Sequence, residues 1–241
     1  MALKSELRQN FTVASYVLKD VIEQLNILSD DRIVEVGCGK GMLSKEIILK
    51  LGRNSGLLLG YEVDNDLRED LEFMKGRSYG RFDYRLQNFL EAKPKTSFNK
   101  CTGNIPYHIS EPLFFKLIDW NFEHIVFITG MKFAKKVTGE IPGKLATISS
   151  HIYESKIMKT YDKNIFFPKS KVDSALLVMV RKNPERKSLE GILSYVMRNT
   201  SKKHAWLNKL LGYANGQTGQ IYHMDLDLLV NTIASRYNAE E

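Results

Sequence analysis

The chain has 241 residues with a formal net charge of +7, 43% hydrophobic and 26% charged residues, and only 16 Gly and 6 Pro, which excludes collagen-like, coiled-coil and disordered proteins. No apolar run approaches the roughly 18 residues of a membrane-spanning helix, and the N-terminus lacks a signal-peptide stretch, so we expect a cytosolic protein. The two cysteines, Cys38 and Cys101, lie in apolar segments without metal-ligand spacing, which favours reduced core residues over a disulfide or a zinc site.

Apolar, strand-like runs alternate with helical patterns through the first half of the chain. This alternation predicts an α/β fold, in which helices cover both faces of a mainly parallel sheet. The predicted strands are residues 32–37, 57–63, 82–86, 99–103 and 124–129, and the predicted helices are 42–51, 66–75 and 113–120. Residues 145–155 also have a helical pattern. Residues 156–161 and 174–180 are expected to form an antiparallel strand pair that closes the sheet.

Residues 181–187 form a basic segment that contains a proline and no periodic pattern of apolar residues, which indicates a hinge or linker. Helical patterns follow at residues 189–198, 204–211 and 226–237. The sequence therefore predicts a main domain at residues 1–181 and a small helical domain at 182–241. The positive charge lies mostly across this boundary, since residues 131–210 carry a net +11 while residues 1–130 carry −1. Such a block suits a polyanion, and a solvated lysine-rich surface is the alternative.

A glycine-rich turn, Glu35-Val36-Gly37-Cys38-Gly39-Lys40-Gly41, follows the first predicted strand and opens a helix. Glycines there let the backbone approach a ligand, and Glu62 on the next strand stands where a carboxylate accepts hydrogen bonds from ribose hydroxyls. The spacing also fits a nicotinamide cofactor or a purely structural turn. The G-x-G-x-G pattern with an acid before it favours an S-adenosylmethionine site.

A second pattern, Gly103-Asn104-Ile105-Pro106-Tyr107, follows the fourth predicted strand at the carboxyl edge of the sheet. An amide oxygen and a main-chain carbonyl that face a pocket can both accept hydrogen bonds from an exocyclic amino group, and a tyrosine offers a stacking surface for a base. The combination suits adenine N6 or cytosine N4. The alternative is a tight Asn-x-Pro turn beside a core tyrosine.

With these two patterns, the sequence resembles the rRNA adenine N6,N6-dimethyltransferases of the KsgA type and their archaeal and eukaryotic counterparts. It also resembles the related Erm methylases. The resemblance covers roughly residues 5 to 181. Five segments in family order carry it: Gln9-Asn10-Phe11, VEVGCGKG at residues 34–41, Tyr61-Glu62-Val63-Asp64, Asn104 to Ser110 (NIPYHIS), and Phe166 to Ala175 (FFPKSKVDSA). Any one of these motifs alone is a weak signal, whereas the ordered set is specific.

The resemblance implies a Rossmann-like S-adenosylmethionine-dependent methyltransferase domain, with a methyl donor bound by Asn10, Thr12, Gly37, Gly39, Glu62, Asn88 and Asn104. It implies that Glu62 holds the ribose and that Asn88 approaches the adenine of the cofactor. Within the catalytic motif Asn104-Ile105-Pro106-Tyr107, Asn104 and the Ile105 carbonyl would orient the target N6. Tyr107 and Phe166 would sandwich the base. Orientation is the main task of such a site, and a strong general base is not required.

The resemblance further implies dimethylation of two adjacent adenines in small-subunit ribosomal RNA by a monomeric enzyme. The RNA contacts would come from basic residues after the fifth strand, in the late motif and in the helical domain: Lys132, Lys135, Lys136, Lys171, Arg198, Lys202 and Lys203. Two alternatives are an Erm-type methylase of large-subunit RNA and a mainly non-catalytic ribosome-assembly or nucleic-acid-binding factor.

Some residues depart from the family pattern. Asn88 stands where the family usually has Asp, so we expect weaker cofactor affinity without its loss. Thr12 replaces a leucine, and Ser170 replaces the second proline of the late motif, which loosens a rigid loop. Three large aromatic residues, Phe114, Phe115 and Trp120, are expected in the core and not at a base.

Overall fold

The computed structural model describes residues 11–12, 15–52, 55–94, 97–120, 122–167, 170 and 172–182. The chain divides into two units, residues 1–182 and 183–241, and every described residue belongs to the first. Apart from Lys182, the predicted helical domain at 182–241 therefore lies outside the described residues. The division into a methyltransferase domain and an RNA-contacting domain stays a prediction.

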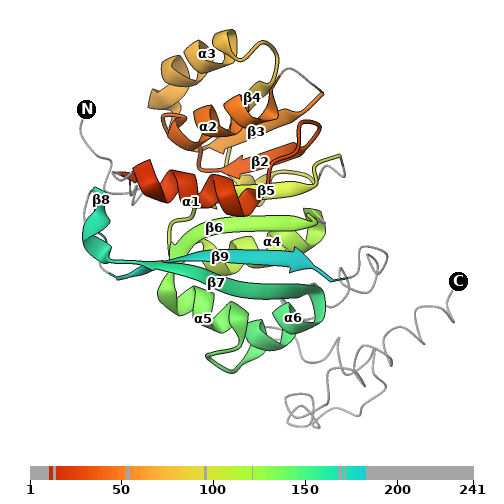
Figure 1. Cartoon of the computed structure of the whole chain (residues 1–241), viewed down its shortest axis with the longest axis vertical. Helices are drawn as coiled ribbons and strands as arrows, with labels where there is room; N and C mark the ends of the chain where they lie inside the picture. The colour runs from red at the N-terminus through yellow and green to blue at the C-terminus, as the bar shows by residue number, and fades with distance from the viewer. Residues whose placement is uncertain are drawn as a thin grey trace, which may run out of the picture. The chain divides into compact units, whose positions relative to one another are not determined.

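A seven-stranded sheet with the order β4-β3-β2-β5-β6-β9-β7 forms the centre of the described unit (Figure 1). The five strands β4, β3, β2, β5 and β6 run parallel to one another. Strand β9 lies between β6 and β7 and is antiparallel to both. The α/β fold, its parallel strands and the antiparallel closing pair are therefore confirmed. The strand bounds are β2 (Arg32–Val36), β3 (Leu57–Glu62), β4 (Phe82–Leu86), β5 (Lys100–Asn104), β6 (His124–Gly130), β7 (Tyr153–Tyr161) and β9 (Ser174–Arg181).

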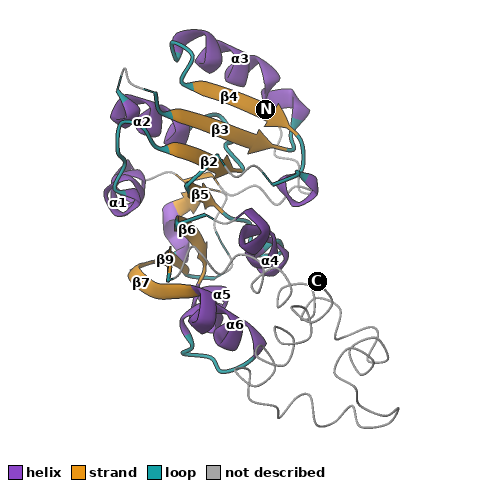
Figure 2. Cartoon of the chain, turned by 90° about the vertical axis from the view of Figure 1, so that its right-hand side faces the viewer, coloured by secondary structure: helices purple, strands orange, loops and turns teal. Residues whose placement is uncertain are grey.

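Helices cover both faces of the sheet. Figure 2 shows α1 and α2 on one face and α4 on the other. None of the helices in the described part of the chain has the length and apolar character needed to cross a membrane. The helix bounds are α1 (Ser15–Leu25), α2 (Met42–Leu51), α3 (Arg68–Arg77), α4 (Ser110–Trp120), α5 (Met131–Thr138) and α6 (Lys144–Ile152), with 3-10 turns η2 (Asn65–Leu67), η3 (Phe89–Glu91) and η4 (Lys163–Ile165).

Helix α1, which the sequence analysis did not predict, is amphipathic. Val17, Val21 and Leu25 recur every fourth residue, so they share one face of the helix, and each is at most 1% exposed. They join an apolar cluster with residues of α2 and the sheet, such as Ile33 and Val126. Burying a side chain of this size stabilises the fold by roughly 1.5–3 kcal/mol, so this face fixes α1 on the sheet.

The aromatic residues expected in the core are there. Trp120 is fully buried and stacks on Phe122 with the ring centroids 5.5 Å apart and the planes 11° from parallel. Phe114 and Phe115 are also buried. Cys38 and Cys101 are buried free cysteines, as predicted.

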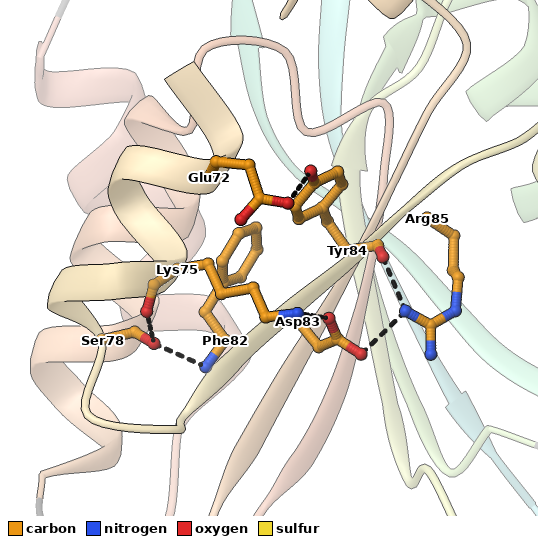
Figure 3. Close-up of polar contacts among 7 residues, drawn as sticks. All are labelled: Glu72, Lys75, Ser78, Phe82, Asp83, Tyr84 and Arg85. Carbon is orange, nitrogen blue, oxygen red and sulfur yellow. Dashed lines mark hydrogen bonds and ion pairs between the residues drawn. The ribbon is translucent and has the colours of Figure 1, made fainter. Parts of the chain in front are cut away.

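Strand β4 is one edge of the sheet, and charged side chains from α3 and β4 cover it (Figure 3). The Asp83 carboxylate accepts from Lys75 Nζ at 2.9 Å and from Arg85 Nη1 at 2.7 Å. The Tyr84 hydroxyl donates to Glu72 Oε1 at 2.5 Å. Water and salt screen exposed ion pairs of this kind strongly. Their larger effect is to make the edge unsuitable for pairing with another chain.

Several predicted boundaries differ from the structure by one or two residues; the helix predicted at 66–75, for example, is α3 at Arg68–Arg77. Three differences bear on the closing strands or on the pocket. Helix α6 ends at Ile152, so residues 153–155 belong to β7; Tyr153 takes an extended backbone, pairs with Arg181, and lies buried beneath its guanidinium. Helix α4 begins at Ser110 rather than at 113, since Pro112 falls in its first turn, where proline is tolerated. Strand β5 extends one residue further than predicted, which makes Asn104 its last residue.

A two-stranded ribbon pairs the first described residues of the chain with the segment between β7 and β9. Strand β1 (Phe11–Thr12) pairs antiparallel with β8 (Phe166–Phe167), with Thr12 opposite Phe166. The ribbon brings Phe11, from the N-terminal motif, together with Phe166 and Phe167 of the late motif. Two-residue strands have no periodicity to read, which is why neither was predicted.

Candidate functional site

The pocket lies at the carboxyl ends of β2, β3 and β5. From β2 the chain continues to β3 and β4 on one side, and it later crosses to β5 and β6 on the other side of β2. Open α/β sheets bind ligands at such a switch point. The walls are largely apolar and include Val17 and Val21 of α1. The polar side chains that line the pocket are Glu35, Lys40, Glu62, Gln87, Asn88 and Asn104.

The glycine-rich turn has the conformation that its sequence predicts. Gly37, Gly39 and Gly41 have φ angles of 72°, 54° and 78°, in the left-handed region that glycine adopts without a steric cost. The main-chain N–H groups of Gly37 and Cys38 both donate to the Tyr61 carbonyl, at 2.8 and 3.1 Å. The turn is thus held against β3, with Gly37 and Gly39 lining the pocket.

Gly103 keeps a second backbone segment close to this turn. A Cβ atom at residue 103 would lie 2.4 Å from the Val36 carbonyl oxygen, far inside van der Waals contact. Only glycine therefore allows β5 to approach the end of β2 here. Gly103 itself lines the pocket beside Asn104.

Glu62, the last residue of β3, is held by main-chain donors. Its Oε2 accepts from Gly39 N–H at 2.8 Å, and its Oε1 accepts from Val63 N–H at 2.8 Å and Asp64 N–H at 3.0 Å. The side chain is only 6% exposed. These bonds fix a carboxylate at the pocket wall, and Oε2, which accepts only one of them, retains a lone pair for a ligand hydroxyl.

Glu35, in β2, is a second carboxyl group at the pocket. It is 2% exposed and accepts a hydrogen bond from the Ser44 hydroxyl at 2.5 Å. Burial, together with the nearby charge of Glu62, raises the pKa of Glu35 to about 8, although the Ser44 bond acts in the opposite direction. Burial, with Glu35 and Glu62 nearby, also raises the pKa of the Cys38 thiol, which favours its protonated and less reactive form.

Asn88 precedes η3 and caps it. Its Oδ1 accepts from Leu90 N–H at 3.0 Å, and its Nδ2 donates to Glu91 Oε1 at 3.4 Å. An amide oxygen has two lone pairs, so Oδ1 can accept one further hydrogen bond from a ligand. The cap thereby aims an acceptor at the pocket that Asn88 lines.

The segment Asn104-Ile105-Pro106 continues β5 into a turn. Asn104 and Pro106 line the pocket, whereas the Ile105 side chain is 2% exposed. Ile105 N–H donates to the Ile128 carbonyl at 2.8 Å, and Ile109 N–H donates to the Pro106 carbonyl at 3.1 Å. Hydrogen bonds to β6 and within the turn therefore hold this backbone in place.

Tyr107 is half-buried next to the pocket and is fixed from two sides. Its hydroxyl lies 2.5 Å from Ser170 Oγ and 2.9 Å from Ser174 Oγ. Its ring packs against the backbone of Gly130, where a Cβ atom would lie 2.9 Å from the ring. Tyr107 thus connects the Asn-Ile-Pro-Tyr segment to the late motif and to the end of β6.

Phe166 is placed differently from the expectation of a base sandwich. It is 3% exposed and belongs to the apolar cluster with Val126, Ile128 and Tyr161. Because a stacking ring must present one face to the base, Phe166 would have to leave this cluster to stack. Its stacking role stays a prediction.

Several predicted site residues cannot be placed. The structure gives Thr12 a place in β1 but does not describe its side chain. The remaining ones lie outside the described residues: Asn10, Lys171, Arg198, Lys202 and Lys203.

The three lysines of the predicted RNA-contacting helix lie on α5. Lys132 is exposed, Lys135 Nζ is 3.6 Å from Glu140 Oε2, and Lys136 Nζ is 3.4 Å from Glu111 Oε2. Both pairs are exposed, so water and salt screen them strongly. The lysines remain accessible to a competing anion.

Glu35, Gln87 and three residues of α1, namely Val17, Leu18 and Val21, line the pocket but were not among the predicted cofactor-binding residues. The four-residue spacing of Val17, Val21 and Leu25 is a readable signal for α1. The acid of the glycine-rich turn is also visible in the sequence. Gln87 offers no such signal, since a polar residue after an edge strand is common.

Taken together, the pocket presents two carboxyl groups, a lysine and three amide side chains along an apolar cleft. Such a site suits a ligand with hydroxyl and amino donors, such as a nucleoside.

Comparison with known proteins places this pocket in a family context. A family profile described as ribosomal RNA adenine dimethylase matches residues 1–229. The chain is similar to a probable ribosomal RNA small subunit methyltransferase A of Thermococcus sibiricus, at 31% identity over 77% of this chain and 67% of the relative. It is also similar to the ribosomal RNA small subunit methyltransferase A of Thermotoga maritima, at 28% identity over 87% of this chain and 74% of the relative.

Solved structures share the fold. A dimethyladenosine transferase from Plasmodium falciparum has a TM-score of 0.65 at 23% identity, over 83% of this chain and 78% of that one. The 23S rRNA methyltransferase ErmE has a TM-score of 0.62 at 22% identity, over 86% of this chain and 91% of that one. At these identities the likeness shows a common Rossmann-like architecture.

Proposed function

Because the chain belongs to the ribosomal RNA adenine dimethylase family, we propose that it transfers methyl groups from S-adenosylmethionine to N6 of adenines in small-subunit ribosomal RNA. The names of the curated relatives support the small subunit as the target. The observation that carries the proposal is that Glu62, Asn88 and Asn104, from three separate motifs, line one pocket. We further propose that two adjacent adenines are each dimethylated.

The acceptor groups of the pocket fit S-adenosylmethionine. Glu62 would accept a hydrogen bond from the ribose diol, and Asn88 Oδ1 would accept from the adenine amino group. The glycine-rich turn would lie against the amino-acid part of the cofactor, with the buried Glu35 carboxyl group nearby. When bound, the cofactor supplies a methyl group activated by a sulfonium. Positive charge on the ligand complements the Glu62 carboxylate.

Asn104 would orient the amine that is methylated. Adenine N6 is a poor nucleophile because its lone pair is delocalised into the ring. Two acceptors aimed at its protons, the Asn104 amide oxygen and the Ile105 carbonyl, favour a geometry in which that pair is available. The fixed backbone of this turn supports such an orienting role. A second methyl transfer needs room beside the amine, and Ile105 in place of a proline is compatible with this.

Tyr107 would form the stacking surface for the target base. Its ring is held by the Gly130 backbone and by two serine hydroxyls, so the ring plane is defined before RNA binds. A base reaches such a surface only when it is unstacked from its neighbours, as in a hairpin loop. The lysines of α5 would then contact phosphates and position the RNA.

The proposal is tested by methyl transfer from radiolabelled S-adenosylmethionine to small and large ribosomal subunits that lack the modification. We expect label only in the small subunit, at adjacent adenines, with dimethyladenosine identified by mass spectrometry. The Asn104→Ala variant is the matched control for adventitious methylation. Label in the large subunit would instead support an Erm-type activity, and binding of subunits without transfer would support an assembly factor.

A further inference from the structure

The hydroxyl group of Tyr107 lies in a small hydrogen-bonded cluster with two buried serines. Ser170 is 5% exposed and Ser174 is 1% exposed. Ser170 Oγ lies 2.5 Å from the Tyr107 hydroxyl, and Ser174 Oγ lies 2.9 Å from it. The next acceptor near the hydroxyl is the Val172 carbonyl, at 3.4 Å.

The number of protons in this cluster sets the direction of each bond. A hydroxyl has one proton to donate. Ser170 gives its proton to the Val172 carbonyl at 2.6 Å, and its oxygen accepts from Val172 N–H at 3.2 Å. Ser170 Oγ is then an acceptor for the Tyr107 proton, and Ser174 donates to the Tyr107 oxygen. Every hydroxyl proton of Ser170 and Tyr107 is used once.

Ser170 is therefore itself fixed by the main chain. Its two bonds to Val172 close a tight turn, so the oxygen cannot move away from Tyr107 without breaking both. On its far side, the Tyr107 ring rests on Gly130. The ring is thus held along one side by a glycine and at its tip by a serine.

We propose that Ser170 is a positioning residue that fixes the plane of Tyr107 as the stacking surface for the target adenine. This inference rests on the proposed function. It assigns a specific task to a residue at which this chain departs from the late motif of its family. A proline at that place has no hydroxyl, so it could not accept the Tyr107 proton. The serine also replaces the rigidity of proline by a hydrogen-bonded turn.

A double-mutant cycle tests the inference. The single-turnover rate of methyl transfer to unmodified small subunits is measured for the wild type, Ser170→Ala, Tyr107→Phe and the double variant. We expect Ser170→Ala to lower this rate about tenfold, with the KM for subunits changed less than about twofold, because orientation and not phosphate contact is affected. In the Tyr107→Phe background, Ser170→Ala should lower the rate less than about twofold, since the hydroxyl through which it acts is already absent.

Two controls separate positioning from a loss of structure. Ser155→Ala removes a comparable hydroxyl pair, Ser149 with Ser155 at 2.9 Å, away from the site, and should leave the rate unchanged. Calorimetric affinity for S-adenosylmethionine should be the same in all variants. If Ser170→Ala does not fold, Ser170→Cys keeps the volume with a much weaker hydrogen-bonding group and is expected to reduce the rate as well.

A spectroscopic measurement tests the anchor without any turnover. In protein with 13C-labelled tyrosine, the ring signals of Tyr107 should shift in Ser170→Ala and stay unchanged in Ser155→Ala. Two results would overturn the inference. One is that the Tyr107 signals stay unchanged in Ser170→Ala, and the other is that Ser170→Ala lowers the rate equally in the wild type and in Tyr107→Phe. A wild-type protein that transfers no methyl group to small subunits would instead contradict the proposed function, while the shift still decides whether Ser170 fixes Tyr107.

Discussion

The Gly39 main-chain N–H donates to the Glu62 carboxylate at 2.8 Å, and this bond adds to the two that the turn makes to the Tyr61 carbonyl. Gly39 follows β2 and Glu62 ends β3, so the bond crosses between neighbouring strands. The glycine-rich turn and the proposed ribose-binding acid are therefore one rigid element. A change at Glu62 should therefore affect both.

Removing the Glu62 carboxylate should weaken cofactor binding. In Glu62→Ala the ribose diol loses a hydrogen bond to a charged group, and the Gly39 N–H loses its acceptor. We expect S-adenosylmethionine affinity to fall by roughly 2–3 kcal/mol in calorimetry. Glu69→Ala, an exposed acid on α3, is the control and should have no effect. Unchanged affinity in Glu62→Ala would remove this residue from the site.

Asn88→Asp, which restores the residue usual in the family, should keep or increase the affinity for S-adenosylmethionine. Asn88→Asp keeps an oxygen that can accept from Leu90 N–H, and it adds charge to any bond with the cofactor amino group. Repulsion from Glu91, which Asn88 Nδ2 contacts at 3.4 Å, acts against this gain at an exposed site. We expect equal or up to about tenfold tighter S-adenosylmethionine binding by calorimetry. A large loss would show that Asn88 does not face the cofactor.

Asn104→Ala should separate chemistry from binding. The variant removes an acceptor that orients the target amine, so the single-turnover rate should fall by about 100-fold or more. RNA affinity depends mainly on phosphate contacts and should change less than about twofold in a filter-binding titration. Near-normal turnover would contradict the orienting mechanism.

Glu35 should make the stability of the protein depend on pH. Its folded pKa of about 8 lies above the unfolded value of 4.5, so between these pH values the folded state keeps a proton that the unfolded state has released. The free energy of unfolding should therefore fall as pH rises through this window, by about 1 kcal/mol per pH unit for this group.

Urea denaturation of the wild type and Glu35→Gln at pH 5.5, 6.5 and 7.5 measures this contribution. The glutamine variant lacks the titration, so its stability relative to the wild type should increase with pH. A difference that is constant across the three pH values would show that Glu35 is ionised in the folded protein.

The lysines of α5 should contribute to the salt dependence of RNA binding. Replacing Lys132, Lys135 and Lys136 with glutamine should reduce the slope of log affinity against log salt by up to about two to three units. Cofactor affinity should stay the same. A Lys45→Gln and Lys50→Gln double variant on α2 is the charge control. If both variants keep the wild-type slope, α5 is only a solvated surface.

The strands and the pocket motifs were predictable because each carries a local signal. The apolar runs at β2 and β3 and the glycines of the turn between β2 and α2 are readable from neighbouring residues alone. The boundary between α6 and β7 was not, since Ile152 and Tyr153 are both apolar and only the pairing of Tyr153 with Arg181 decides the conformation. Long-range pairing overrides local propensity at such a junction.

The contacts that complete the site depend on residues far apart in the chain. That Phe166 lies in the core, and that Ser170 bonds to Tyr107, follows from the path of the chain between β7 and β9. A serine in place of a proline reads as a loosened loop in the sequence. The structure instead gives that serine three hydrogen bonds, one with the Tyr107 hydroxyl and two with the main chain of Val172.

The position of β9 between β6 and β7 has a consequence for synthesis on the ribosome. Strands β2 to β6 emerge in the first 130 residues and can form the floor of the cofactor pocket, but β6 keeps an open edge until Ser174–Arg181 has been translated. Ser170 and Ser174, which hold Tyr107, emerge with that same segment. The strands that frame the proposed cofactor pocket are therefore translated before the serines that hold Tyr107, the proposed base-stacking residue, and those serines arrive with the strand that closes the edge of β6.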